Sequence, residues 1–428
     1  MSNVVIDLGE VRRTPAAVVA DRPPVPFRTV FGLLSIVLVA LLAGGVPRAR
    51  QVPPTVIPAR LGDATFVSDN RLFVVSAGRQ VRGADVQNRV VSTYSLPDAR
   101  LLGSTMVSVS GGVTWAWQGG GVVVVSYQVD STGVWAVVAV AENTGKALWR
   151  RAARWVGGSE KAALAVLSTD DAELAVELTT GRVRWTLPHP RDGYTAAAGP
   201  DIDFPRWLVT VTDSGRLETR DPRTGGILAR TSMARVPGRA NGLMWSVGDL
   251  IVVAGGGSGF DAYRLPGLER VWHTTADLSQ SWTQADCGRL LCTFRMQRGM
   301  TVLDAVDGRE LWSDDRWAYA ESSGEYLLAT ELDRYSDRPV VYVLDPATGR
   351  PLGNFGDWEF LGPAAGGQFY GKLDVRGQYK IFYGLLDPAT RHVRILGSGS
   401  RVSGSCEIGR GVLMCRLIDA SIALWPLG

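Results

Sequence analysis

The chain has 428 residues, and its 45 basic and 42 acidic side chains leave a net charge of +3, which gives no indication of nucleic-acid binding. Fifty glycines, 14 tryptophans and a charged fraction of only 20% favour an all-β domain, and the length allows a substantial core. Only three histidines are present, they are scattered, and CxxC spacing is missing, so a zinc site is not expected.

The N-terminal segment contains one long apolar run. Residues 1–26 are predicted to form a short cytoplasmic tail that is disordered or, through Val4–Val11, adds to a partner's sheet edge. Phe27–Val46 has 20 residues with Arg28 as its single charge, and a helix of that length spans about 30 Å, enough to cross a bilayer. We therefore expect a transmembrane signal anchor, with a cleaved signal peptide as the alternative.

Arginines on both sides of the apolar run predict its orientation. Four precede or begin it and three follow it: Arg12, Arg13, Arg22 and Arg28, then Arg48, Arg50 and Arg60. The slight excess on the first side places the N-terminus in the cytoplasm. A single-pass protein of the cytoplasmic membrane with an extracytoplasmic domain is thus expected, and the prolines in residues 47–60 predict an extended stalk between the two.

A short phrase recurs along the rest of the chain. It consists of a β-like run, an acidic residue, a Thr-Gly-type turn and a strand that often ends in Trp, as in Ala141–Trp149 (AENTGKALW). Successive copies are spaced by 36 to 46 residues, with their last position at Gly103, Trp149, Trp185, Ala229, Trp272, Trp312, Gly353 and Ile395. That spacing is the length of a four-stranded propeller blade.

Each residue type of the phrase has an expected structural role. The acidic residue can accept hydrogen bonds from the turn's amides, the glycine can adopt a left-handed conformation, and the Trp can pack on the neighbouring blade. The repeat residues are Gly145, Trp149, Glu177, Gly181, Trp185, Asp221, Gly225, Trp272, Asp304, Gly308, Trp312, Asp345, Gly349 and Asp387. Two copies depart from the pattern: Ser95–Gly103 has Ala99 in place of the glycine, and Arg264–Trp272 is interpreted with one extra residue.

The pattern A-x-D-x-x-T-G-x-x-x-W resembles the signature of PQQ-like (quinoprotein-type) β-propeller repeats, in the style of BamB-like proteins. The resemblance covers Leu61 to Gly428 and implies four-stranded antiparallel blades around a channel, commonly eight. We predict eight blades after one transmembrane helix, with seven or nine as alternatives. The 33 residues after Ile395 are expected to close the ring with an N-terminal strand such as Thr55–Leu61, because closure removes exposed sheet edges.

All four cysteines lie in the predicted propeller. Cys287 and Cys292 face each other across a short hairpin, and Cys406 and Cys415 flank a second one. An even number of cysteines in an oxidising compartment favours two local disulfides, Cys287–Cys292 and Cys406–Cys415, with four buried thiols as the alternative.

The expected function is that of a membrane-anchored, monomeric binding or scaffolding module for a protein or a cell-envelope component. Catalytic, cofactor-binding and metal-binding residues are not assigned, because no motif with such chemistry is found. One alternative is a quinoprotein dehydrogenase, for which the resemblance implies pyrroloquinoline quinone (PQQ), calcium and a vicinal Cys-Cys disulfide; no adjacent cysteine pair exists. The other alternative is a sensory ectodomain, which would need a signalling partner.

Overall fold

The computed structural model describes residues 53–427 apart from 69, 81–85, 130–131, 200–202, 234–243, 256–258, 280, 284–286, 296–298, 332–339 and 376. Contacts divide the chain into Met1–Ala49 and Arg50–Gly428, and all described residues belong to the second unit. The predicted cytoplasmic tail and the predicted transmembrane helix Phe27–Val46 therefore lie outside the described residues. Within the described part, no helix is long and apolar enough to cross a membrane.

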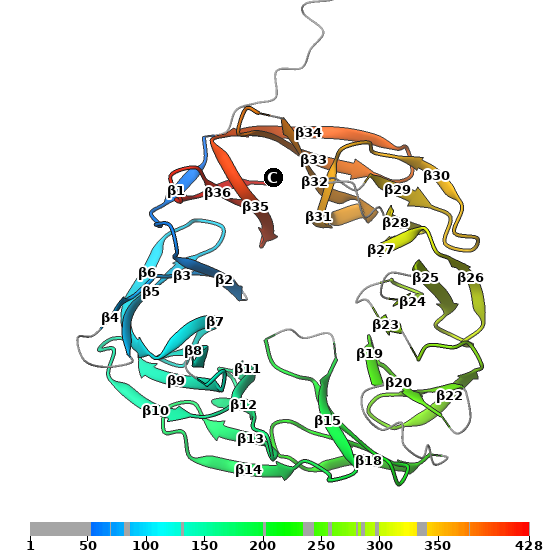
Figure 1. Cartoon of the computed structure of the whole chain (residues 1–428), viewed down its shortest axis with the longest axis horizontal. Coiled ribbons are helices and arrows are strands. Elements are labelled where there is room, and N and C mark those ends of the chain that lie inside the picture. Colours follow the sequence, from blue (N-terminus) through cyan, green and yellow to red (C-terminus); the bar gives the residue numbers. More distant parts are fainter. Residues whose placement is uncertain are drawn as a thin grey trace, which may run out of the picture. The chain divides into compact units, whose positions relative to one another are not determined.

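The described strands form nine antiparallel sheets that are arranged as the blades of one ring (Figure 1). Blade 1 contains β2 (Ala64–Ser68), β3 (Arg71–Val75), β4 (Arg79–Gln80), β5 (Gln87–Ser95) and β6 (Leu101–Val109). Blade 2 contains β7 (Gly111–Gly119), β8 (Val122–Val129), β9 (Trp135–Ala141) and β10 (Ala147–Arg151). Blade 3 contains β11 (Arg154–Ser159), β12 (Leu164–Ser168), β13 (Ala172–Glu177) and β14 (Val183–Pro188).

Blades 4 to 6 follow the same order. Blade 4 contains β15 (Gly193–Ala198), β16 (Trp207–Thr212), β17 (Arg216–Arg220) and β18 (Ile227–Ser232). Blade 5 contains β19 (Met244–Val247), β20 (Leu250–Ala254), β21 (Phe260–Arg264) and β22 (Glu269–Thr274). Blade 6 contains β23 (Ser281–Thr283), β24 (Leu290–Arg295), β25 (Gly299–Asp304) and β26 (Glu310–Asp314).

Blades 7 to 9 complete the ring. Blade 7 contains β27 (Trp317–Ser323), β28 (Tyr326–Glu331), β29 (Val341–Leu344) and β30 (Pro351–Asn354). Blade 8 contains β31 (Glu359–Pro363), the 3-10 turn η1 (Ala365–Gly367), β32 (Phe369–Val375), β33 (Lys380–Asp387) and β34 (His392–Ser400). Blade 9 contains β35 (Val402–Gly409), β36 (Val412–Leu417), β37 (Ile422–Pro426) and, from the other end of the sequence, β1 (Thr55–Ile57).

The all-β propeller predicted from the sequence is confirmed, but the prediction of eight blades is wrong, because there are nine. β1 pairs antiparallel with β37, with Ile57 opposite Ile422. Blade 9 therefore takes its fourth strand from the N-terminal side, as the expected closure required. The repeated phrase marks the turn between the third and fourth strands of a blade. A blade whose fourth strand comes from elsewhere has no such turn, so eight phrases correspond to nine blades.

Burial explains why the blades stack. Middle strands such as β16 are buried along their whole length, because neighbouring blades cover both faces. Outer strands such as β14 are mostly exposed. Apolar clusters join neighbouring blades: one joins blades 4 and 5 through Val209 and Ile251, and another joins blades 9 and 1 through Ile57 and Leu72.

The motif tryptophans connect successive blades at their turns. The Trp312 indole Nε1 donates to Pro346 O at 2.7 Å, and a Cβ placed on Gly349 would lie 2.7 Å from the same ring. The equivalent hydrogen bonds run from Trp149 to Leu178 O, from Trp185 to Pro222 O and from Trp272 to Ala305 O. Each ring also lies against the next turn's glycine, namely Gly181, Gly225 and Gly308.

The turns without glycine keep the same backbone geometry. Leu268 has a φ of +62° and its N–H donates to Arg264 O, as the N–H of Gly349 donates to Asp345 O. Leu268 therefore occupies the glycine position, and the interpretation of this copy as having one extra residue is wrong. Between blades 7 and 8 the large and small residues change places. Arg391 occupies the glycine position of its turn, and Gly353 occupies the position where several copies have Trp. The Arg391 side chain lies over Gly353.

The acidic residues of the phrase bind their own turns. Oδ1 of Asp345 accepts from Ala347 N at 2.9 Å, and Asp221, Asp304 and Asp387 accept from the amide two residues on in the same way. Glu177 differs: its carboxylate accepts from Thr180 Oγ1 and from Arg182. The hydrogen bond from Arg182 is the main cause that lowers the pKa of Glu177 to about 2.

The two predicted disulfides are confirmed. Cys287 and Cys292 are bonded at the start of β24, with their Cα atoms 6.0 Å apart. Cys406 and Cys415 are bonded across β35 and β36, where they are direct register partners. Each bond closes a local loop in one sheet.

One loop links blades on different sides of the ring. Between β15 and β16, the Asp203 carboxylate accepts from Ser68 Oγ of blade 1 at 2.6 Å. The Asp203 carbonyl accepts from Gly158 N of blade 3 at 2.8 Å. Asp203 of blade 4 is thus hydrogen-bonded to both blade 1 and blade 3.

Candidate functional site

A pocket of about 570 Å³ lies at the junction of blades 2 and 3, and we call it the Trp135 pocket. Blade 2 contributes residues 132–135 of the β8–β9 loop, blade 3 contributes the β12–β13 turn, and the connectors before β11 and after β14 complete the wall. In an antiparallel blade these loops share one end of the strands, and the motif turns lie at the other end. None of the motif residues lines this pocket.

Trp135 and Arg154 form one wall of the pocket. The guanidinium carbon of Arg154 lies 5.2 Å from the centre of the Trp135 ring, within the range of a cation–π contact. Trp135 begins β9 and Arg154 begins β11, so the contact joins the two blades. The contact orients an exposed cation along an aromatic surface, where the guanidinium can still donate hydrogen bonds at its edge.

His189 also lines the pocket and is held by three contacts. Its backbone N–H donates to Asp171 O at 2.8 Å. Nδ1 lies 3.3 Å from Asp170 O, and Nε2 lies 3.2 Å from Glu173 Oε1. Each ring nitrogen therefore faces an oxygen atom of the same blade. The ring orientation is therefore fixed before any ligand arrives.

Glu173 supports His189 from behind the pocket. Its side chain is buried, Oε1 also accepts from Ser168 Oγ at 2.8 Å, and Oε2 is buried with no hydrogen-bond partner among the described residues. Burial raises the pKa of Glu173, and the hydrogen bonds from Ser168 and His189 oppose that rise. The order Ser168–Glu173–His189 is not that of a nucleophilic triad, because there the imidazole must lie between the hydroxyl and the carboxylate.

A second pocket of about 620 Å³ lies between blades 8 and 9. Its wall includes Lys372, which is only 5% exposed and pairs with Glu359 at 2.8 Å and Asp374 at 3.2 Å. The ammonium group is thus compensated by two carboxylates, as a buried charge requires.

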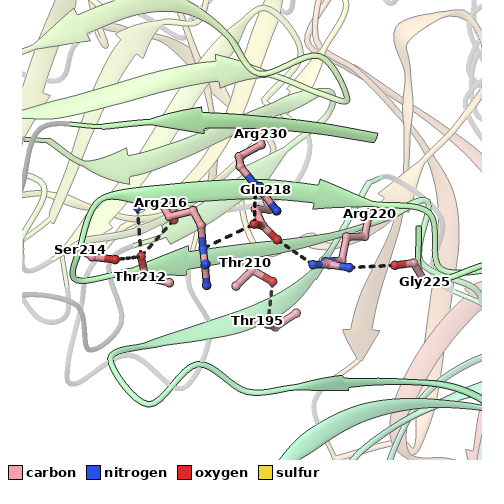
Figure 2. Close-up of polar contacts among 9 residues, drawn as sticks. All are labelled: Thr195, Thr210, Thr212, Ser214, Arg216, Glu218, Arg220, Gly225 and Arg230. Carbon is pink, nitrogen blue, oxygen red and sulfur yellow. Dashed lines mark hydrogen bonds and ion pairs between the residues drawn. The ribbon is translucent and has the colours of Figure 1, made fainter. Parts of the chain in front are cut away.

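Blade 4 carries a buried carboxylate among three arginines (Figure 2). Glu218, which is 3% exposed, accepts from Arg230 Nε at 2.7 Å and from Arg220 Nη2 at 2.8 Å, with Arg216 Nε at 3.5 Å. Neighbouring Leu217 packs toward blade 5, so Glu218 points toward blade 3. Burial acts to raise the pKa of Glu218, but Arg220 and Arg230 together outweigh it and lower the pKa.

Hydroxyl groups continue this polar surface along the same face of blade 4. Thr195 and Thr210 share a hydrogen bond of 2.9 Å, and Thr212 and Ser214 share one of 2.7 Å (Figure 2). Blade 4 therefore presents polar side chains toward blade 3 and apolar ones toward blade 5.

The cysteines do not fit the quinone site that the family resemblance implies. Each cysteine is bonded to a partner five or nine residues away, in blade 6 or blade 9, so no vicinal disulfide forms. Among the described residues, no group of three or more His, Cys, Asp or Glu side chains is placed to hold a metal ion.

Only weak signals for the Trp135 pocket are visible in the sequence. Arg154 ends the basic run Arg150–Arg154, which is more simply interpreted as a solvated edge. Trp135 is outside the repeated phrase, and Glu173 and His189 are 16 residues apart. Trp135 and Arg154 meet because blades 2 and 3 are neighbours, whereas Glu173 and His189 meet because β13 pairs with β14.

No protein-family model and no curated protein matches the chain. Three solved structures to which it is similar are BamB from Moraxella catarrhalis (12% identity, TM-score 0.44, 87% of this chain and 99% of that chain), the computationally designed Ika8 protein (13%, 0.41, 75% and 98%) and dihydro-heme d1 dehydrogenase NirN in complex with DHE (14%, 0.42, 85% and 84%). Likeness at this level decides nothing about activity or partners. The architecture rests on the strand pairing of the chain itself.

Proposed function

We propose that the chain is a rigid binding module that holds a protein or cell-envelope partner on the face that contains the Trp135 pocket. The observation that carries the proposal is the preformed pocket itself. Arg154 is oriented by Trp135, and His189 is held by Asp170, Asp171 and Glu173. Side chains that are ordered before binding reduce the entropy lost on association.

The closed ring supports this role. The β1–β37 pairing and the Trp-to-turn hydrogen bonds connect blade to blade, so blades 2 and 3 form a fixed frame for the pocket. We propose that the module works without quinone or calcium, in an oxidising compartment, as the two disulfides favour. Phe27–Val46 would anchor it in the cytoplasmic membrane.

Site-specific photocrosslinking in the host cell tests this function. A benzophenone amino acid at Val134, which is 48% exposed and lines the pocket, is expected to give a discrete adduct. The matched control is Leu228, which is 50% exposed on outer strand β18. Adducts of Val134 that Trp135→Ala removes support the proposal. No adduct at Val134, or the same adduct from both positions, contradicts it.

A further inference from the structure

We infer that the Trp135 pocket binds a saccharide, and this inference rests on the proposed function of the pocket as a binding site. Its volume of about 570 Å³ is within the range of small-ligand sites. The ligand class follows from the charge balance, the apolar surface and the hydrogen-bonding groups of the wall.

The charges of the wall compensate each other. Arg154, a cation, and Asp170, an anion, both line the pocket, and His189 is hydrogen-bonded to the buried Glu173. A strongly anionic ligand would meet Asp170, and a cationic ligand would meet Arg154. The wall therefore favours a ligand that is polar without a net charge.

The hydrogen-bonding groups of the wall are both donors and acceptors. Arg154 can donate, and Asp170 can accept. Gln128 donates its amide N–H to Gly133 O at 2.9 Å, which leaves its side-chain oxygen as an acceptor for the pocket. Adjacent hydroxyl groups, each of which donates and accepts, match this mixture better than a carboxylate or an ammonium group does.

Trp135 adds the apolar part of the wall. The Trp135 indole and the Arg154 guanidinium that lies over it together offer a flat surface on which the C–H face of a pyranose ring can pack, while the hydroxyl groups around that ring reach the polar side chains. Glu173 fixes His189 from behind, so the wall keeps its shape without ligand. An aromatic surface edged by Arg, Asp and Gln side chains is thus suited to a short sugar chain.

Titration calorimetry on the full-length protein tests the inference, with N,N′,N″-triacetylchitotriose and maltotriose as probes. At least one trisaccharide is expected to bind, and Trp135→Ala and Arg154→Ala are each expected to weaken binding at least tenfold. The matched control is Arg206→Ala, since Arg206 also lies over a Trp ring, 4.6 Å from the centre of Trp207, but is outside the pocket. This variant is expected to bind like the unchanged protein.

Three results would overturn the saccharide inference. They are no binding of either probe at 10 mM, binding that the Trp135 and Arg154 variants leave unchanged, and displacement of the sugar by sodium acetate at equal concentration, which would indicate an anion site. A Val134 photo-adduct without sugar binding would leave the proposed function standing and reject only the saccharide. Absence of both the Val134 adduct and sugar binding would reject the proposed function and the saccharide inference together.

Discussion

The Trp312 ring of blade 6 lies on Gly349 of blade 7, and its indole N–H donates to Pro346 O in the same turn. Two features require glycine at position 349, namely its backbone conformation and the closeness of the Trp312 ring. Its φ of +67° is left-handed, and a Cβ would lie 2.7 Å from the ring. The repeated phrase is therefore a device for joining blades, and its residues are separate from the proposed binding pocket.

Gly349→Ala should destabilise the fold through both requirements. We expect a loss of about 3 kcal/mol, from about 1–2 kcal/mol for a left-handed alanine and a similar cost for overpacking against Trp312. Gly356→Ala is the control, because Gly356 has a φ of +63° and nothing within 4 Å of a Cβ. Gly356→Ala should lower the free energy of unfolding only by the cost of the left-handed alanine backbone, about 1 kcal/mol. Equal losses in denaturant unfolding would reject the contact with Trp312 as a cause.

The Trp312 side chain can be tested in two steps. Trp312→Phe keeps most of the apolar surface and removes the hydrogen bond to Pro346, so we expect a loss of about 1 kcal/mol. Trp312→Ala also leaves a cavity and should cost about 3–5 kcal/mol. Thermal unfolding measures both. An unchanged melting temperature for Trp312→Ala would show that the ring does not stabilise the blade junction.

Glu218 should make the stability of the domain sensitive to acid. Its pKa in the folded protein is lowered, so its contribution is present above the unfolded value of about 4.3 and is lost as the pH falls through the lower folded value. Glu218→Gln should cost about 2 kcal/mol at pH 7, because three arginines lose their carboxylate. The two proteins should converge only as the pH falls from about 4.3 through the lower folded pKa.

Urea unfolding at pH 7, 5, 4 and 3 checks this convergence. Glu177→Gln is the control, because Glu177 also pairs with two arginines but at a more exposed site. Its effect at pH 7 should be the smaller of the two, since exposed ion pairs contribute little. A constant difference between the unchanged protein and Glu218→Gln at every pH would contradict the role of the charge.

The disulfides should be present in the cell and should stabilise the fold. Alkylation of thiols before lysis is expected to leave all four cysteines unmodified, as in an oxidising compartment. Replacing Cys406 and Cys415 together by Ser should cost about 2–3 kcal/mol, since the bond closes a short loop. Full alkylation of the native protein in the cell would place the domain in a reducing compartment and contradict the proposed location.

Much of the fold could be predicted from the sequence because the repeat is local. Asp345, Gly349 and Trp312 act within one turn or between adjacent turns, so their spacing is visible in the chain. The blade number does not follow from the count of phrases, because blade 9 takes β1 as its fourth strand and so has no phrase of its own. The Leu268 turn was misread because a left-handed leucine is rare, so the pattern favoured Gly267 as the turn residue.

The Trp135 pocket could not be predicted from the sequence for a different reason. Trp135 and Arg154 meet across a blade junction, and Ser168, Glu173 and His189 meet at a strand end. None of these residues belongs to the periodic pattern. Asp203 is similar, because its partner Ser68 is 135 residues away in the sequence. Contacts of this kind depend on how the ring closes.

Closure of the ring by β1 holds blades 2 and 3 as fixed walls of the pocket. Val56 and Ala423 are register partners in β1 and β37. The most direct test is the double variant Val56→Cys, Ala423→Cys in the full-length protein, analysed by peptide mass spectrometry after mild oxidation. A closed ring predicts a disulfide between the two introduced cysteines in a folded monomer. Free thiols at both positions, with the two native disulfides intact, would contradict the nine-bladed ring.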